Sequence, residues 1–342
     1  MKILFSNKIL FFFVVTLFFA ACNNSEEKKI DAIQVAPVPF DNMEDELFAI
    51  TSANIQEKGN FLSHQYQIFF IYYLENVLGA GSFRDSLSKE KILQFINDKD
   101  IELVYKEVKK SFPTPERKKI ENNLLQLHKY LKYYFPSKPI PEKYVSCVTG
   151  FNYQIMYPDS GKIIGIGLDM YLGQNNYLYQ LLQWPQYRVR QLNKEYITCD
   201  VAKAWLFNNF SPQKFNNLLE NMMYYGKIFY ALDKLLPNEQ DSIKWAYTPA
   251  QLGYCNKYEK NLWGFFVEDN KLYDNNPKII STFLNDGPFT AAINKECPPR
   301  IAMYVGYRIV KQYMQNNKGV NLEQLMQENN AQKILQHSKY KP

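Results

Sequence analysis

Cys22 has the surroundings of a cysteine that receives a lipid. It follows two alanines, and the apolar run 9–21 before it stands behind Lys2 and Lys8. A short apolar run behind a basic start is typical of a secretory signal, and this run is too short to cross a bilayer comfortably. We therefore expect a signal peptide over 1–21 and a lipid on Cys22. An uncleaved anchor, or an ordinary secretory signal with an incidental Cys22, would fit the same run.

The histidines do not have the spacing of a metal site. No two of them stand four residues apart on one helix, and no H-E-x-x-H string occurs. The nucleophile string G-x-S-x-G and the phosphate-binding P-loop are absent as well. The sequence therefore predicts no catalytic residue, no metal ligand and no cofactor. The histidines are His64, His128 and His337.

Carboxylates would form a glycosidase pair only if folding brought two of them together. Asp169 is the most suggestive, because it stands where an apolar stretch gives way to a turn that ends at Gly173. We expect Asp169 to cap the following turn through backbone N–H groups, and a functional carboxylate is the alternative. The acidic residues considered are Asp169, Asp200, Glu220 and Asp233.

The remaining cysteines are widely spaced and form no C-x-x-C pair, so zinc-ribbon and thioredoxin-like sites are not expected. An exported protein meets oxidising conditions that permit disulfides, but small buried thiols are also common. The disulfide state of these cysteines stays open at this point. They are Cys147, Cys199, Cys255 and Cys297.

The charge of the chain does not favour a nucleic-acid partner. The formal net charge is +6, and loss of Lys2 and Lys8 with the signal would leave +4 without a basic block. About 300 residues follow the expected tether, and 16% of all residues are aromatic. This length allows one large domain or two small ones, and the aromatic residues supply ample apolar surface for a core.

The pattern along the chain predicts an α+β protein that is predominantly α-helical with a small central antiparallel sheet. Residues 22–39 are polar and end in prolines, so we expect a flexible tether. A single globular domain over 40–342 then follows. Apolar spacing predicts helices over 40–135, a sheet over 140–170 and helices again over 175–342. The expected strands are 144–149, 153–157 and 163–168, joined as a meander.

Helix starts are marked by a capping residue followed by proline, as at Ser211, Thr248 and Asn276. On this basis the helices of the second half are expected at 196–210, 212–235, 249–269, 277–284, 300–315 and 322–336.

Most of the mature chain resembles one family. The similarity is carried by GLDMYLG at 167–173, MYYGKIFY at 223–230, LLP at 235–237, YTPAQL at 247–252, GPFT at 287–290, PPR at 298–300, YVGYRIVKQYM at 304–314, AQKIL at 331–335 and SKYKP at 338–342. These segments look like the gliding motility lipoprotein GldB family of Bacteroidetes. The resemblance implies a membrane-attached accessory of the gliding and type IX secretion apparatus. It does not supply a biochemical activity.

A second resemblance concerns gluzincin zinc peptidases. The segment 200–204 stands where such an enzyme has its first metal-binding helix, and 224–228 resembles the second. The catalytic positions would then hold Asp200, Val201, Ala204 and Tyr225. These residues cannot reproduce the zinc ligands or the general base of that family. The resemblance implies a degenerate peptidase scaffold, and two ordinary core helices are the alternative.

Together these patterns predict a non-catalytic, lipid-anchored component of the gliding or secretion machinery, with the membrane and machinery proteins as partners and no nucleic acid. The expected location is the cell envelope, at the outer membrane, on a face that stays open. Residues 25–28 resemble an acidic surface-export tag, or else are a solvated charge run. The alternative functions are an envelope hydrolase or residual metallopeptidase with an unrecognised site, and a ligand-binding lipoprotein.

Overall fold

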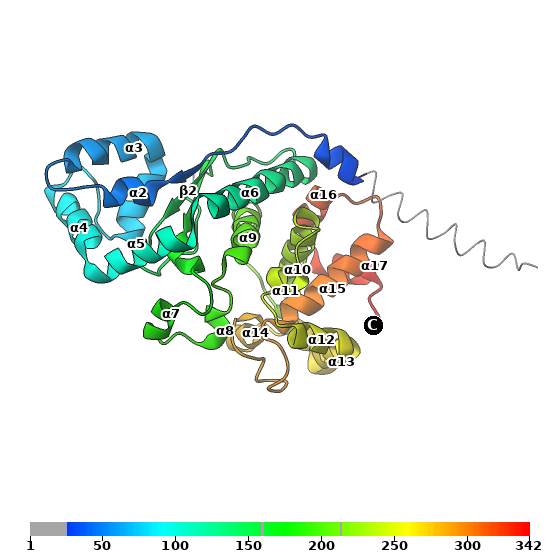
Figure 1. Cartoon of the computed structure of the whole chain (residues 1–342). Coiled ribbons are helices and arrows are strands. Elements are labelled where there is room, and N and C mark those ends of the chain that lie inside the picture. Colours follow the sequence, from blue (N-terminus) through cyan, green and yellow to red (C-terminus); the bar gives the residue numbers. More distant parts are fainter. Residues whose placement is uncertain (1–25, 159–160, 213) are drawn as a thin grey trace, which may run out of the picture.

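The computed structural model describes residues 26–158, 161–212 and 214–342 (Figure 1). The expected signal peptide and Cys22 lie outside these residues. Helices make up most of the described chain and a single small sheet lies among them, so the predominantly helical α+β class is confirmed. Within the described ranges, no helix combines the length and the apolar character needed to cross a membrane.

The sheet has four short strands in the order β1-β2-β4-β3. β1 is parallel to β2, β2 is parallel to β4, and only β3 is antiparallel to its neighbour β4. The prediction of an antiparallel sheet was therefore wrong: the sheet is mixed. The strands are β1 (Phe40–Asn42), β2 (Lys143–Cys147), β3 (Ile155–Met156) and β4 (Ile163–Gly167).

The strand order follows from burial. Every residue of β4 is buried, which suits a central strand covered on both faces, whereas β3 is only two residues long and suits an edge. β4 therefore enters between β2 and β3 instead of adding outside β3. The edge beside β2 is taken by β1, whose residues were expected to belong to the first helical region.

The sheet divides two hydrophobic cores. Because successive side chains of a strand point to opposite faces, Val145 and Cys147 face one core while Tyr144 and Ile164 face the other. The smaller core lies under the helices of the N-terminal half (Figure 1). These helices are α2 (Met43–Phe48), α3 (Ile55–Tyr72) with the π-helical turn η1 (Tyr73–Val77), and α4 (Ser86–Asn97); α5 (Lys99–Ser111) and α6 (Thr114–Tyr134) lead back to the larger core.

The larger core is built around α10, which packs along α15 over most of its length. Gly226 of α10 and Gly306 of α15 meet where the two helices cross. The longer helices of this half are α9 (Ile197–Asn209), α10 (Leu218–Leu235), α12 (Pro249–Lys257), α13 (Glu259–Val267), α14 (Pro277–Leu284), α15 (Ile301–Asn316), α16 (Leu322–Gln327) and α17 (Ala331–Ser338). Short turns complete it: η2 (Leu168–Tyr171), α7 (Tyr177–Leu181), α8 (Gln186–Val189), η3 (Lys194–Tyr196), α11 (Asp241–Trp245) and η4 (Glu268–Tyr273).

Side-chain capping marks where several of the helices begin. Thr248 forms a capping box with Gln251, and the Asn276 side chain accepts from the N–H of Lys278, so both predicted starts are confirmed. The predicted start at Pro212 was wrong. α10 begins six residues later, where Asn217 accepts from the N–H of Glu220.

Residues 26–39 pack on the domain. Residues 26–31 are helical, and Ile30 and Val38 are buried in the larger core. Two lysines of α6 donate hydrogen bonds to this stretch: Lys129 to the carbonyl of Asp31 and Lys132 to the carbonyl of Gln34. In Figure 1 the stretch runs beside α6 from the α16 end of the domain to β1. Of the expected tether 22–39, only residues 22–25 lie outside the described chain.

Candidate functional site

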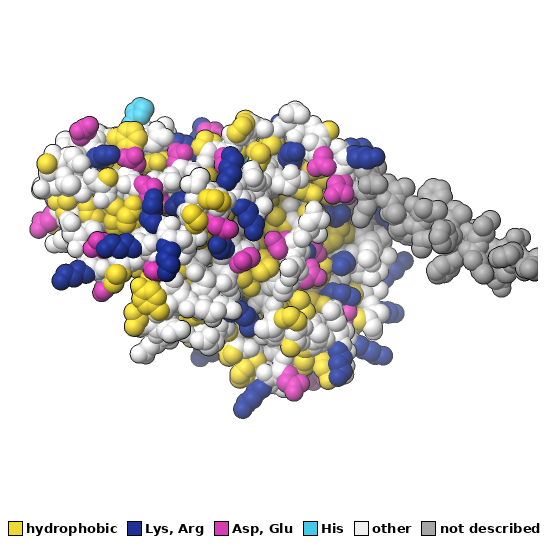
Figure 2. Space-filling model, in the orientation of Figure 1, with side chains coloured by type: hydrophobic (Ala, Val, Ile, Leu, Met, Phe, Trp, Pro, Cys, Tyr) yellow, Lys and Arg dark blue, Asp and Glu magenta, His cyan; other side chains and the backbone are white. Residues whose placement is uncertain are grey.

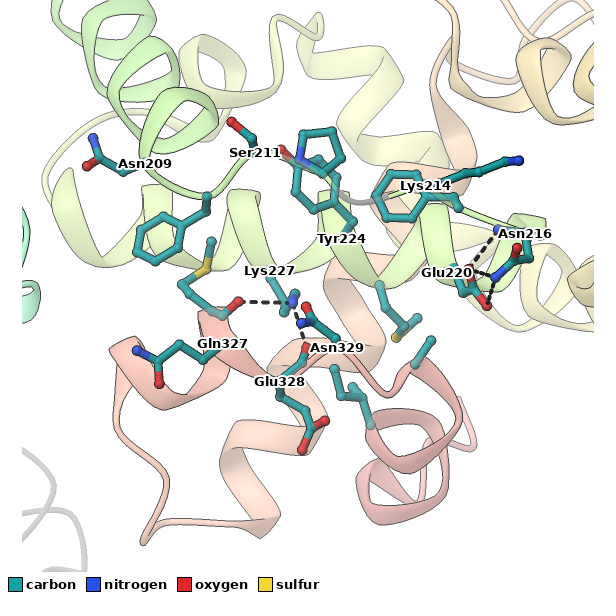
Figure 3. A pocket seen from close by; sticks show the side chains of 17 residues that line it. Asn209, Ser211, Lys214, Asn216, Glu220, Tyr224, Lys227, Gln327, Glu328 and Asn329 are labelled. Carbon is teal, nitrogen blue, oxygen red and sulfur yellow. Dashed lines mark hydrogen bonds between the residues drawn. The ribbon is translucent and has the colours of Figure 1, made fainter. Parts of the chain in front are cut away.

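A pocket of about 440 Å³ opens between α10, the segment before it, and the turn that joins α16 to α17 (Figure 3). Its wall is mixed: aromatic and methionine side chains alternate with amides, two hydroxyls, two ammonium groups and the carboxylates of Glu220 and Glu328. A pocket of this size and composition suits a small ligand or a peptide segment. Its main lining residues are Asn209, Phe210, Ser211, Phe215, Met223, Tyr224, Lys227, Met326, Gln327 and Asn329.

Lys227 supplies the buried positive charge of the pocket, and the exposed Lys214 lines the pocket as well. The Lys227 side chain is only 5% exposed, and its ammonium donates to the carbonyl of Glu328 at 2.7 Å and to that of Met326 at 3.2 Å. These carbonyls end α16, where the last oxygens lack helical partners and the helix dipole favours a cation. Lys227 thus caps α16 from a different helix, which fixes the wall of the pocket.

The positive charge of the Lys227 ammonium is only partly balanced by negative charge nearby. Burial lowers its pKa to about 8, and the nearby Glu328 carboxylate offsets this only in part because it pairs with Lys333 at 2.5 Å. An ammonium has three N–H donors, and the hydrogen bonds within the described chain use two. The third can donate to a carboxylate or carbonyl oxygen brought by a ligand.

Tyr224 adds a second donor to the same pocket. It lies one turn before Lys227 on α10 and is 6% exposed, yet its hydroxyl has no hydrogen-bond partner within the described chain. Burial raises its pKa, so the hydroxyl stays protonated and can donate. In Figure 3 the ring points toward the segment that holds Ser211, while Lys227 points toward Glu328. The two donors therefore serve different ends of the pocket.

A buried polar atom without a partner costs free energy, about 1–3 kcal/mol, and a ligand oxygen would reach the Tyr224 hydroxyl only after neighbouring side chains move, because the hydroxyl oxygen is itself shielded from solvent. Phe215 packs beside Tyr224 with ring centroids 5.1 Å apart and supplies apolar surface. Neither Tyr224 nor Lys227 was singled out as a pocket residue from the sequence. The one available signal was a lysine inside the otherwise apolar stretch of α10.

The four carboxylates considered from the sequence do not form one site. Glu220 holds the N-terminal end of α10 by accepting from the N–H of Asn216 at 2.7 Å. Asp233 accepts from the Tyr307 hydroxyl and pairs with Lys244. Each carboxylate forms its hydrogen bonds or ion pairs with different residues.

Asp169 is fully buried and does cap a turn, but not the turn that follows it. Its carboxylate accepts from the N–H groups of Thr149 at 2.9 Å and Phe151 at 2.6 Å, in the loop after β2. The expected role, accepting from backbone N–H groups, is confirmed. The expected position was wrong, because the capped loop precedes Asp169 in the chain instead of following it. Burial raises the Asp169 pKa to about 6, against the opposing effect of these hydrogen bonds.

The degenerate zinc-peptidase scaffold is not supported. Asp200 of α9 accepts from the Tyr171 hydroxyl at 3.0 Å, whereas Tyr225 of α10 packs against Phe207 at the other end of α9. The two positions that would correspond to metal ligands therefore serve different regions. Over the ranges that the structure describes, no three His, Cys, Asp or Glu side chains are grouped as metal ligands. The two helices are ordinary core elements.

The histidines are also dispersed. His64 and His337 are exposed, and His128 is buried, with its Nε2 2.7 Å from the Tyr144 hydroxyl. Burial lowers the His128 pKa to about 4, so it is neutral near pH 7. The cysteines that the sequence left open are all buried free thiols: Cys147, Cys199, Cys255 and Cys297.

The described residues form a mostly helical α+β fold, and aromatic surface and hydrogen-bonding side chains line its pocket on α10. The chain belongs to a family described as gliding motility protein GldB, whose model matches residues 23–342. This confirms the resemblance drawn from the sequence segments. Comparison with curated proteins and with solved structures gave no match.

Proposed function

We propose that this protein is a lipid-anchored envelope component of the gliding-motility machinery and of its associated secretion apparatus, and that it acts by binding rather than by catalysis. The observation that carries the proposal is the family match, which covers nearly the whole chain and begins at the residue after Cys22. The sequence before it supports lipidation of that cysteine. We place the protein at the outer membrane, on the strength of the acidic residues that follow Cys22.

The pocket on α10 is the proposed docking point for a partner of the machinery. Lys227 offers one free donor and Tyr224 another, and aromatic surface lies beside them. Such a wall fits a peptide segment that brings a carboxylate or carbonyl oxygen to each donor. A partner oxygen would also relieve the cost of the unpaired Tyr224 hydroxyl.

The anchor is tested with Cys22→Ser in the native cell. We expect the wild-type protein to incorporate labelled fatty acid and to sediment with the membranes, and the variant to lose both properties. Retention of the variant in the membrane fraction would contradict lipid anchoring at Cys22.

The docking role is tested by in-cell crosslinking of the tagged, lipidated protein. We expect gliding or secretion components to be recovered with the wild type and several-fold less with Tyr224→Phe, which removes only the unpaired hydroxyl and leaves the fold intact. Tyr177→Phe, at an exposed tyrosine of α7, is the matched control and should behave as wild type. Equal recovery with Tyr224→Phe would exclude the pocket, and recovery of no machinery protein with the wild type would exclude the wider proposal.

A further inference from the structure

The chain between the proposed lipid and the domain is short. Glu26 is already docked on the domain, with its carboxylate 3.9 Å from the Lys234 ammonium, and Ile30 is 2% exposed in the larger core. Only four residue steps separate Cys22 from Glu26, and four extended residues span at most about 14 Å. A lipid on Cys22 would therefore hold the surface around Glu26 within about that distance of the bilayer.

The surface around Glu26 has the chemistry of a headgroup contact. Two hollows of about 480 and 500 Å³ flank Glu26, and both are lined by Tyr134, Tyr230 and Lys234. Tyrosine suits this region because its ring is apolar and its hydroxyl is polar. The aliphatic stem of lysine can lie along a ring while the ammonium reaches a phosphate.

Further cations and tyrosines complete the same surface. Lys318, Tyr133 and Glu323 line one hollow, and Lys311 lines the other together with Glu27 and Asp233, so the surface carries both charge signs, as a zwitterionic headgroup does. Lys318 is exposed and Lys311 and Tyr133 are half-buried, so these side chains can reach a layer outside the domain. Figure 2 shows basic and acidic side chains together at the end of the domain where the described chain begins. The anchor face is defined here as Tyr133, Tyr134, Tyr230, Lys234, Lys311 and Lys318.

We infer that the anchor face lies against the lipid headgroups of the membrane that holds Cys22, so that the domain has one fixed side toward the bilayer. The inference rests on the proposed lipidation of Cys22. The length of chain outside the structure, and the point on the domain where it ends, select the membrane as the occupant of this face. The opposite end of the domain, with α3 and α4, then faces the aqueous space (Figure 1).

The test uses the lipidated mature protein in vesicles of phosphatidylethanolamine and phosphatidylglycerol. A fluorescent dye is attached to Lys318→Cys on the anchor face or, as the matched control, to Lys106→Cys on α5, where the lysine side chain is 62% exposed. The natural cysteines are buried and should not compete for the dye. Lipids with a spin label on the headgroup quench a dye that lies at the membrane surface.

We expect several-fold stronger quenching at position 318 than at position 106. Equal quenching at both positions, or stronger quenching at 106, with the protein still floating with the vesicles, would overturn the anchor face while lipidation stands. If the protein with its natural Cys22 does not float with the vesicles, the lipid anchor itself is refuted. Strong quenching at position 318 only in a Cys22-dependent complex with a second protein, and not in vesicles alone, would assign the face to that protein and overturn the inference.

Discussion

Substitution of Gly306 tests the helix crossing on which the pocket depends. An added Cβ at Gly226 would lie 2.5 Å from the carbonyl carbon of Gly306, and one at Gly306 would lie closer still to the carbonyl oxygen of Met222. Ordinary contacts of a Cβ begin near 3.4 Å. Since the obstructing atoms belong to the backbone, they cannot rotate away, and α10 and α15 would have to separate by about 1 Å or more.

We expect Gly306→Ala to lower the free energy of unfolding by about 3 kcal/mol, the upper end of the usual cost of overpacking. Alanine is the better helix former by about 1 kcal/mol, so the clash must outweigh that gain. The measurement is urea unfolding, followed by circular dichroism, of the mature chain with Cys22→Ser. The lipid is absent there, so only the fold is measured.

Gly253→Ala is the matched control, because Gly253 lies in α12 and an added Cβ would meet no heavy atom within 4 Å. We expect this variant to be as stable as the wild type or more stable by about 0.5–1 kcal/mol. Wild-type stability of Gly306→Ala alongside this result would refute the close crossing.

Two further predictions concern buried titrating groups with opposite effects on stability. The folded-state pKa of His128 is about 4, below its ordinary 6.5, so its contribution to stability is present above pH 6.5 and is lost as the pH falls through 4. In Asp169→Asn, which removes the opposing effect of Asp169, the free energy of unfolding should fall by about 3 kcal/mol over that window. The folded-state pKa of Asp169 is about 6, above its ordinary 3.8, so its contribution to stability is present below pH 3.8 and is lost as the pH rises through 6. In His128→Gln the free energy of unfolding should therefore rise by about 3 kcal/mol when the pH is lowered from 6.5 to 4. Urea unfolding at several pH values measures both effects. The stability of the wild type should vary less with pH than that of either variant. Identical pH profiles for the two variants would contradict both pKa shifts.

Local signals in the sequence predicted the elements whose ends are decided locally. α14 begins at Pro277 and ends at Leu284 as expected, because Asn276 caps it and the apolar pattern stops there. The expected helix over 322–336 divides at residues 328–330, since Asn330 caps a new helix from Ala331. That cap has the same chemistry as Asn276 but lacks a following proline, and the sequence pattern passed over it.

What the sequence could not predict depends on contacts between distant segments. The position of β4 between β2 and β3 is decided by two-sided burial, which a local alternation pattern does not reveal. The partners of Lys227 lie about a hundred residues further along the chain, in the turn after α16. Asp169 was recognised as a capping residue, but the loop that it caps could be found only from the structure.

The pocket and the anchor face are linked because α10 carries both. Lys227 and Lys234 stand seven residues apart on this helix, a rise of about 10 Å. With the anchor face on the headgroups, the pocket opens close to the bilayer surface and not at the far end of the domain. The proposed partner segment would then reach the pocket along the membrane, as a juxtamembrane stretch of another envelope protein can. Loss of the anchor should therefore weaken capture of the partner, since the lipid is what holds the pocket near the bilayer surface.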